Sequence, residues 1–160
     1  MCNKTKYDRV IKKGKKNRRL RFRLNAYNYG QRRCACCCVQ MTWETESEID
    51  ITTHRTATLE HLVPASKGGG YQVKNILITC KKCNNSRGTE DWIHFVERNQ
   101  FPKKEWLIQK YLESVDMYEK GKYTQYDKDF ILVTRIIENK NPIDQDIFDN
   151  VNEYLAKKAA

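Results

Sequence analysis

The residues best suited to chemistry stand close together in the middle of the chain. Glu60 and His61 are neighbours, and Asn84 follows 23 residues after His61. A carboxylate supplies a hard oxygen ligand for a divalent cation, and an imidazole accepts a proton from water at neutral pH. A cation held by one carboxylate and one amide keeps open positions for water and phosphate oxygens. The three residues therefore predict metal-assisted hydrolysis, with His61 deprotonating the water that attacks phosphorus.

Glu60 and His61 can serve one site only where a strand is interrupted. Successive side chains of a strand point to opposite faces, so a bulge or a strand end has to lie beside this pair. Pro64 and the glycines at 68–70 predict such an end. Asn84 directly follows Cys83, so its position depends on what holds that cysteine.

Two CxxC pairs predict a structural zinc site. Cys34 and Cys37 form the first pair, Cys80 and Cys83 form the second, and 42 residues separate the two. Four thiolates from two such pairs form the tetrahedron that Zn²⁺ prefers. Cys36 and Cys38 flank Cys37 and compete for the metal, but the CxxC spacing favours Cys34 with Cys37. Zinc at this site would join the segment before the strands to the start of the following helix.

Short elements are expected to position these residues. The sequence favours strands at TATLEHLV (56–63) and NILITC (75–80), with a turn-rich loop at PASKGGGYQ (64–72) between them. KKCNNSRGTEDWIHFVER (81–98) favours a helix broken near Gly88. His94 lies beside Trp92 and Phe95 on this helix, where it is predicted to pack rather than to bind metal. We expect residues 34–98 to form an α+β core.

Residues 99–160 are predicted to form an α-helical region that packs on the core or is appended to it. Apolar residues recur every three or four positions in EWLIQKYLESVDMY (105–118), DFILVTRII (129–137) and IDQDIFDNVNEYLAKK (143–158). Pro102 and Pro142 stand where helices would begin, and Asp144 is a candidate cap. This region is the part of the chain that could bind a protein partner.

The first 33 residues form a basic N-terminal arm. They hold 13 Lys and Arg against one acid, Asp8, whereas residues 34–160 hold 17 against 19 acids. Such a segment attracts the phosphate backbone of nucleic acid, although a solvated tail has the same composition. Alternation in LRFRL (20–24) favours a strand slightly over a helix. The residues expected to bind nucleic acid here are Lys12, Lys13, Lys15, Lys16, Arg18, Arg19 and Arg21.

The sequence predicts no membrane association. It contains no apolar stretch of spanning length, and its first residues lack the hydrophobic segment of a signal peptide. We expect an intracellular, cytoplasmic protein, in which CxxC pairs bind metal more readily than they form disulfides.

The combined motifs resemble the HNH nuclease family. The resemblance rests on EHLVPASKGG (60–69), NIL (75–77) and CKKCNNSRG (80–88), and it covers about residues 33–90. The family implies a ββα-metal core, and the cysteine pairs match its zinc-binding subgroup. It further implies an endonuclease that cleaves DNA, with RNA not excluded, using one catalytic Mg²⁺ or Mn²⁺ beside the structural Zn²⁺.

Carried onto this chain, the resemblance assigns a role to each site residue. His61 matches the general base, Glu60 and Asn84 the ligands of the catalytic metal, and Asn75 the residue that hydrogen-bonds across the loop and keeps the histidine in register. Arg87 matches a basic position expected to contact phosphate. Two positions depart from the commoner family pattern: Glu60 stands where Asp is commoner, and Asn84 stands where His is commoner. Asn85 becomes a substitute metal ligand if the helix starts one residue out of the expected register.

One alternative function stays open. A catalytically inactive, zinc-dependent nucleic-acid-binding module would have the same cysteines and the same basic arm. By resemblance, a small basic nuclease suits a phage or mobile element, in homing or restriction, but target specificity, strand number and oligomeric state do not follow from the sequence.

Overall fold

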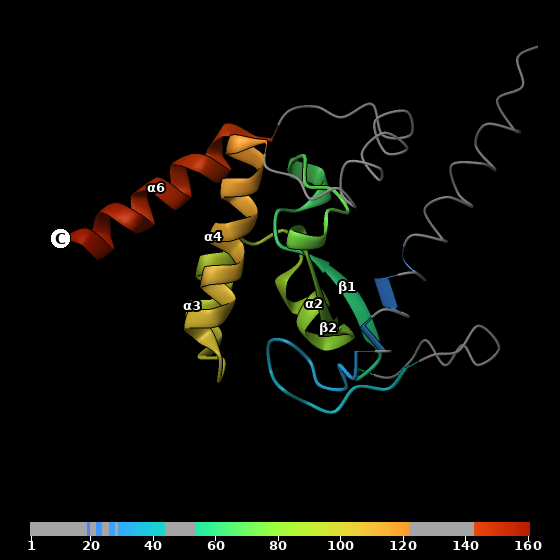
Figure 1. The fold of residues 1–160 in the computed structure, drawn as a ribbon. Coiled ribbons are helices and arrows are strands. Elements are labelled where there is room, and N and C mark those ends of the chain that lie inside the picture. Colours follow the sequence, from blue (N-terminus) through green and yellow to red (C-terminus); the bar gives the residue numbers. More distant parts are fainter. Residues whose placement is uncertain (1–18, 20–21, 24–25, 28, 44–53, 122–142) are drawn as a thin grey trace, which may run out of the picture.

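A two-stranded antiparallel sheet and a helix that follows it form the centre of the protein. The computed structural model describes residues 19, 22–23, 26–27, 29–43, 54–121 and 143–160. Strand β1 (Ala57–His61) pairs with β2 (Ile76–Cys80), and α2 (Lys81–Arg87) follows β2 directly. This β-β-α order confirms the α+β fold class (Figure 1).

The strand register fixes which side chains share a face. Glu60 lies opposite Leu77 and Thr58 opposite Thr79, whereas His61 lies opposite Ile76 on the alternate positions. Paired residues of an antiparallel sheet point to the same face. Thr58 and Glu60 are therefore on one face of β1, and His61 is on the other, at the last residue of the strand.

The helix expected over 81–98 is broken where the glycine predicts. Gly88, with φ of 56°, follows α2, and α3 (Trp92–Asn99) begins after Asp91, whose carboxylate accepts hydrogen bonds from the N–H groups of Ile93 and His94. The prediction that His94 packs is wrong. Its side chain is 70% exposed and pairs with Glu90, because it lies on the solvent side of α3.

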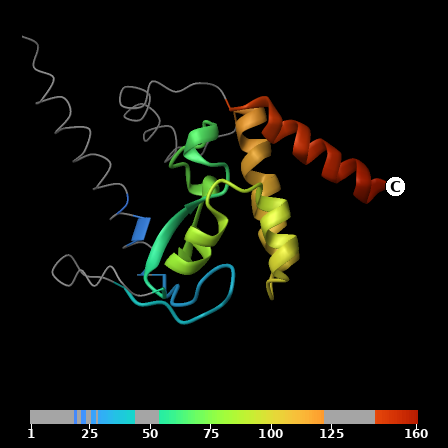
Figure 2. The same ribbon diagram turned by 180° about the vertical axis from the view of Figure 1, so that it is seen from behind.

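Two further helices cover the core. The long helix α4 (Lys104–Lys120) packs beside α3, where the indole N–H of Trp92 donates to the carbonyl of Leu107 at 3.0 Å. Helix α6 (Gln145–Ala159) starts beside the C-terminal end of α4, runs at an angle to it and buries Ile147 and Val151 (Figure 2). Asp144 stands at its N-cap but makes no side-chain capping bond. Fully buried side chains in this core include Trp92, Phe95, Leu107 and Tyr111.

Some expected elements lie partly or wholly outside the described residues. These are the helix over 129–137, the helix start at Pro142 and most of the basic arm, including Lys12, Lys13, Lys15, Lys16, Arg18 and Arg21. In the described part of the arm, Arg19, Phe22, Arg23, Ala26 and Tyr27 are helical, so the preference for a strand is wrong there. Among the described residues, no helix has both the length and the apolar character needed to cross a membrane.

Candidate functional site

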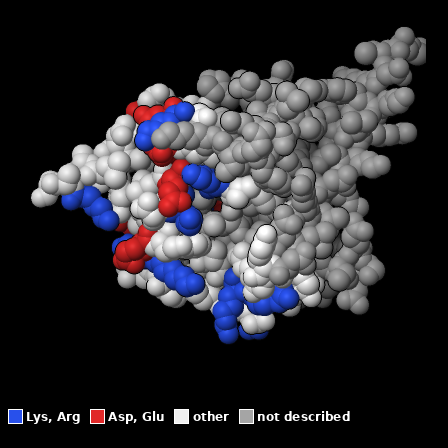
Figure 3. Space-filling view, in the orientation of Figure 1, with Lys and Arg blue, Asp and Glu red and all other residues white. Residues whose placement is uncertain are grey.

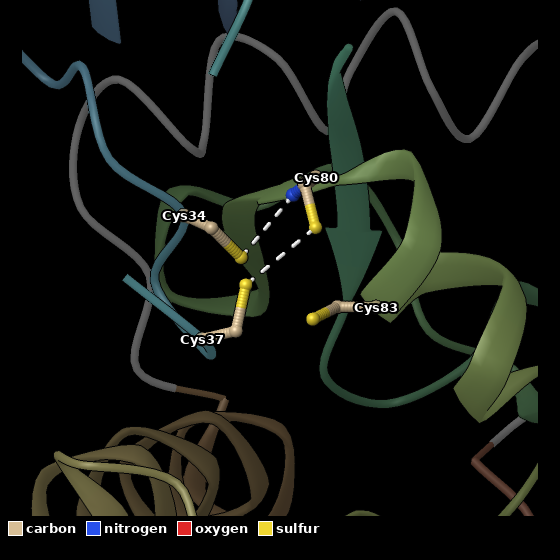
Figure 4. A group of neighbouring side chains, drawn as sticks. All are labelled: Cys34, Cys37, Cys80 and Cys83. Atoms are coloured by element: carbon tan, nitrogen blue, oxygen red, sulfur yellow. Dashed lines mark hydrogen bonds between the residues drawn. The ribbon is translucent and has the colours of Figure 1, made fainter. Parts of the chain in front are cut away.

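Four cysteine sulfurs meet beside the start of α2. The Sγ atoms of Cys34, Cys37, Cys80 and Cys83 all lie within 4.8 Å of one another (Figure 4). The sulfurs of Cys37 and Cys80 are 3.8 Å apart. A tetrahedron with Zn–S bonds of about 2.3 Å has edges of about 3.8 Å. The four thiols are therefore placed to bind a metal ion, and zinc fits both the ligand type and the spacing.

Local backbone geometry explains why these two pairs converge. Cys34 and Cys37 lie in a tight turn closed by a bond from the N–H of Cys38 to the carbonyl of Cys34, with Cys38 at a φ of 61°. Cys80 is the last residue of β2, and Cys83 lies in the first turn of α2. The N–H of Ala35 donates to the carbonyl of Ile78 at 3.1 Å, which ties the turn to the outer edge of β2.

Ionisation of the cysteines is linked to their mutual contacts. Hydrogen bonds from Cys36 and Cys83 lower the pKa of Cys34, whereas burial raises the pKa of Cys80 to about 11. The pKa of Cys36 is raised, chiefly by its hydrogen bond with Cys34. Cys36 is thus a buried neighbour of the ligands, outside the group of four sulfurs that lie at mutual metal-binding distance.

Glu60 is held by an arginine. Its Oε1 atom accepts a hydrogen bond from Nη1 of Arg87 at 2.5 Å, and the two side chains are 6% and 1% exposed. Burial raises the pKa of Glu60, against the opposing effect of the Arg87 charge. The same guanidinium donates to the carbonyls of His61, Leu62 and Glu90 and lies 5.0 Å from the ring of Trp92.

The expected phosphate contact of Arg87 has no support in this geometry. A phosphate-binding arginine presents its N–H groups to solvent, whereas those of Arg87 are directed at protein oxygens inside the core. The structure gives Arg87 a different position, in which it fastens the end of β1 to α2.

Asn84 lies on the same side of β1 as Glu60. Its Nδ2 atom donates to the carbonyl of Leu59 at 2.9 Å and to Oγ1 of Thr58 at 3.1 Å. Since the amide nitrogen is used by β1, the oxygen Oδ1 is the atom that can serve a ligand. Asn84 and Arg87 are one turn apart on α2; Asn84 contacts the middle of β1 and Arg87 contacts its last two residues. Asn85, the substitute ligand, is exposed.

His61 lies on the face of β1 opposite that of Glu60. It is the last residue of β1, and its ring packs edge-on against Tyr71, with ring centroids 4.6 Å apart. Its Nε2 atom is buried. The strand end predicted beside the Glu60–His61 pair is present, without a bulge, because the register of β1 and β2 is regular as far as His61.

Asn75 locks the loop that follows β1. It is fully buried, and its Oδ1 accepts from the N–H of Val63 and the hydroxyl of Ser114, each at 2.8 Å. Its Nδ2 donates to the carbonyls of Val63 and Gly70 at 3.1 and 2.8 Å. All four hydrogen-bonding positions of the amide are thus used. These bonds cross the loop as expected of Asn75, and its part in catalysis stays a prediction.

Several residues that contact the site were not predicted from the sequence. Ser114 lies on α4, 39 residues from Asn75, and nothing in its local sequence marks it. Tyr118, also on α4, accepts from the N–H of Gly70 at 2.7 Å and donates to Gln72 at 2.6 Å. The glycine run predicted a loop that includes Gly69, but the sequence did not predict the close approach of Gly69 to the backbone of Val63.

Comparison with known proteins agrees with the motifs. Residues 47–92 match the family model described as HNH endonuclease. This segment includes β1, β2, α2 and the second cysteine pair, whereas Cys34 and Cys37 precede it. Searches of curated proteins and of solved structures gave no match.

Proposed function

Because residues 47–92 belong to the HNH endonuclease family, we propose that this protein hydrolyses phosphodiester bonds in DNA with one catalytic divalent metal. The observation that carries the proposal is the placement of Glu60 and Asn84. Asn84, from α2, bonds Thr58, and Thr58 lies on the same face of β1 as Glu60.

The donor set suits a hard cation. One carboxylate and one amide oxygen are ligands that Mg²⁺ and Mn²⁺ accept, leaving further positions for water and phosphate. Glu60 and Asn84 are the residues that would hold this ion. When bound, it would stabilise the negative charge that develops on the leaving oxygen.

His61 is proposed as the general base. An imidazole accepts a proton near neutral pH, and the contact with Tyr71 restricts the orientation of the ring. Arg87 donates to the backbone carbonyl of His61 and to the side-chain carboxylate of Glu60, so one guanidinium holds the backbone at His61 and the side chain of Glu60. Asn75, by holding Val63 and Gly70, would keep the loop after His61 in place.

The four-cysteine site is proposed to hold structural Zn²⁺. With the metal bound, Cys83 would fix the first turn of α2, and through it the position of Asn84. Lys12, Lys13, Lys15, Lys16, Arg18, Arg19 and Arg21 are proposed to bind the DNA backbone, and the C-terminal helices to bind any protein partner.

A cleavage assay tests the proposal. Zinc-loaded protein should cut plasmid DNA when Mg²⁺ or Mn²⁺ is added, and His61→Ala should abolish cutting while leaving the circular dichroism spectrum unchanged. Cutting by His61→Ala at the wild-type rate would refute the assignment of the base. Linear, branched and RNA substrates with mapped ends would define what is cut.

One observation favours a second candidate, the inactive zinc-dependent binding module. Glu60 is paired with Arg87 in a buried site, and an arginine beside a metal ligand competes with the cation for the carboxylate. Nucleic-acid binding without cleavage in any of Mg²⁺, Mn²⁺, Ca²⁺, Co²⁺ or Zn²⁺ would establish this alternative.

A further inference from the structure

A basic groove lies between the first cysteine turn and α4. Its volume is about 840 Å³, and its walls are residues 29–35, the short helical turn before β2 and the first half of α4. The outer edge of β2, from Ile76 to Ile78, also lines it. The turn and the start of α4 lie at the same end of the molecule, and Lys and Arg side chains gather at that end in the space-filling view (Figures 1 and 3).

The charge of the groove is strongly positive. Five cations line it against one acid, Glu113, whose carboxylate is already paired with Lys110 at 3.0 Å. The cations come from three separate segments of the chain, and they are Arg32, Arg33, Lys74, Lys103 and Lys110. Three of the five cations belong to residues 34–160, which as a whole carry more acids than bases, and the other two are the last residues of the basic arm.

Two exposed aromatic rings lie among these cations. Trp106 is 43% exposed and Tyr29 is 90% exposed, and both line the groove. Lys103, Trp106 and Lys110 are spaced by three and four residues, so they share one face of the α4 segment. A core-forming tryptophan would be buried, as Trp92 is in α3.

Cations interleaved with exposed aromatic rings suit an unpaired nucleic-acid strand. Lysine and arginine neutralise its phosphates, and an exposed ring stacks on a base only where the base is not covered by its neighbours in a duplex. We propose that this groove binds a single-stranded segment of nucleic acid, with Trp106 stacking on a base. The proposal rests on the proposed function to the extent that the strand would belong to the nuclease substrate.

Binding measured without cleavage tests the groove separately from the nuclease. A fluorescent oligothymidylate is titrated with zinc-loaded His61→Ala protein in the absence of Mg²⁺ and Mn²⁺. Trp106→Ala should weaken binding by roughly 5- to 150-fold, the equivalent of one stacked base. Trp106→Phe should retain most of the affinity. Lys74→Gln with Lys103→Gln should lower the slope of log K against log salt by about 0.7 for each phosphate that is no longer neutralised.

The matched control is Lys158→Gln. Lys158 is an exposed cation near the C-terminal end of α6, away from the groove, and this substitution should leave binding unchanged. Equal affinities of the Trp106→Ala and parent proteins for the oligothymidylate would overturn the proposal. Binding of duplex DNA with no binding of the single strand would also overturn it. If the groove variants weaken binding but no substrate is ever cut, the groove stands and the nuclease proposal falls. If cleavage occurs and the groove variants bind normally, the nuclease proposal stands and the groove proposal falls.

Discussion

The Nη1 atom of Arg87 lies 2.5 Å from the Oε1 atom of Glu60, and both side chains are almost completely buried. A buried ion pair contributes little when compared with apolar residues, but removing one partner leaves an unpaired charge in the interior. Arg87 also donates to the carbonyls of Leu62 and Glu90, so its removal would take a donor from these oxygens as well as from the carboxylate.

Arg87→Ala is therefore expected to lower the free energy of unfolding by about 3–5 kcal/mol. Urea denaturation of the zinc-loaded protein measures this. Arg87→Lys should recover little of the stability, because one ammonium group cannot follow the planar fork of the guanidinium. A decrease below about 1 kcal/mol for Arg87→Ala would show that water replaces the guanidinium.

The basic arm supplies a prediction that is independent of the core. Replacing Lys12, Lys13, Lys15 and Lys16 by Gln should lower affinity for duplex DNA of any sequence and reduce the salt slope by about 0.9 for each phosphate left without a cation. The titration uses His61→Ala protein at several salt concentrations. An unchanged slope would show that the arm does not bind the backbone.

Zinc removal should unfold the core. Cys80→Ser deletes one of four ligands and is expected to abolish the native circular dichroism spectrum, because binding of a structural zinc contributes directly to the folding free energy. Cys38→Ser is the control, since Cys38 is outside the four-sulfur group. A Cys80→Ser protein that stays folded without metal would contradict the structural role.

The pH dependence of zinc binding has a definite sign. Burial raises the pKa of Cys80 to about 11, so this thiol is protonated at neutral pH in the metal-free protein. Zinc binds thiolates and must release that proton, so the apparent affinity should rise with pH. Competition with a chromogenic chelator between pH 6 and 8 measures the trend, and affinity independent of pH would contradict it.

The local elements and the four-cysteine cluster could be predicted from the sequence, whereas the long-range contacts of Arg87 could not. The segment TATLEHLV predicted β1, Pro64 and the glycines predicted the loop, and the CxxC spacing predicted a sulfur cluster that the structure forms. Arg87 was assigned to phosphate because it matches a basic position of the family that the motifs resemble. Its burial depends on α2 packing against the end of β1, which no local pattern encodes.

Gly69 is expected to accept no side chain. A Cβ atom at this position would lie 1.7 Å from the carbonyl oxygen of Val63, and backbone cannot move aside as a side chain can. Gly69→Ala should therefore open the loop after β1 and cost about 3 kcal/mol or more. The contrast is Gly30→Ala, which meets nothing within 4 Å and carries only the strain of a φ of 75°, about 1 kcal/mol. Urea denaturation measures both variants, and an equal loss of unfolding free energy in the two would refute the predicted clash at Gly69.

Asn75 should tolerate no carboxylate. Asn75→Asp keeps the shape of the side chain but replaces the Nδ2 donor, so that a buried oxygen faces the carbonyls of Val63 and Gly70. Two unsatisfied acceptors and a buried charge are expected to cost about 3 kcal/mol or more. Ser114→Ala removes only one donor to Oδ1 and should cost about 1 kcal/mol. Thermal unfolding of the two variants ranks them, and a smaller destabilisation for Asn75→Asp than for Ser114→Ala would mean that the amide nitrogen does not hold the loop.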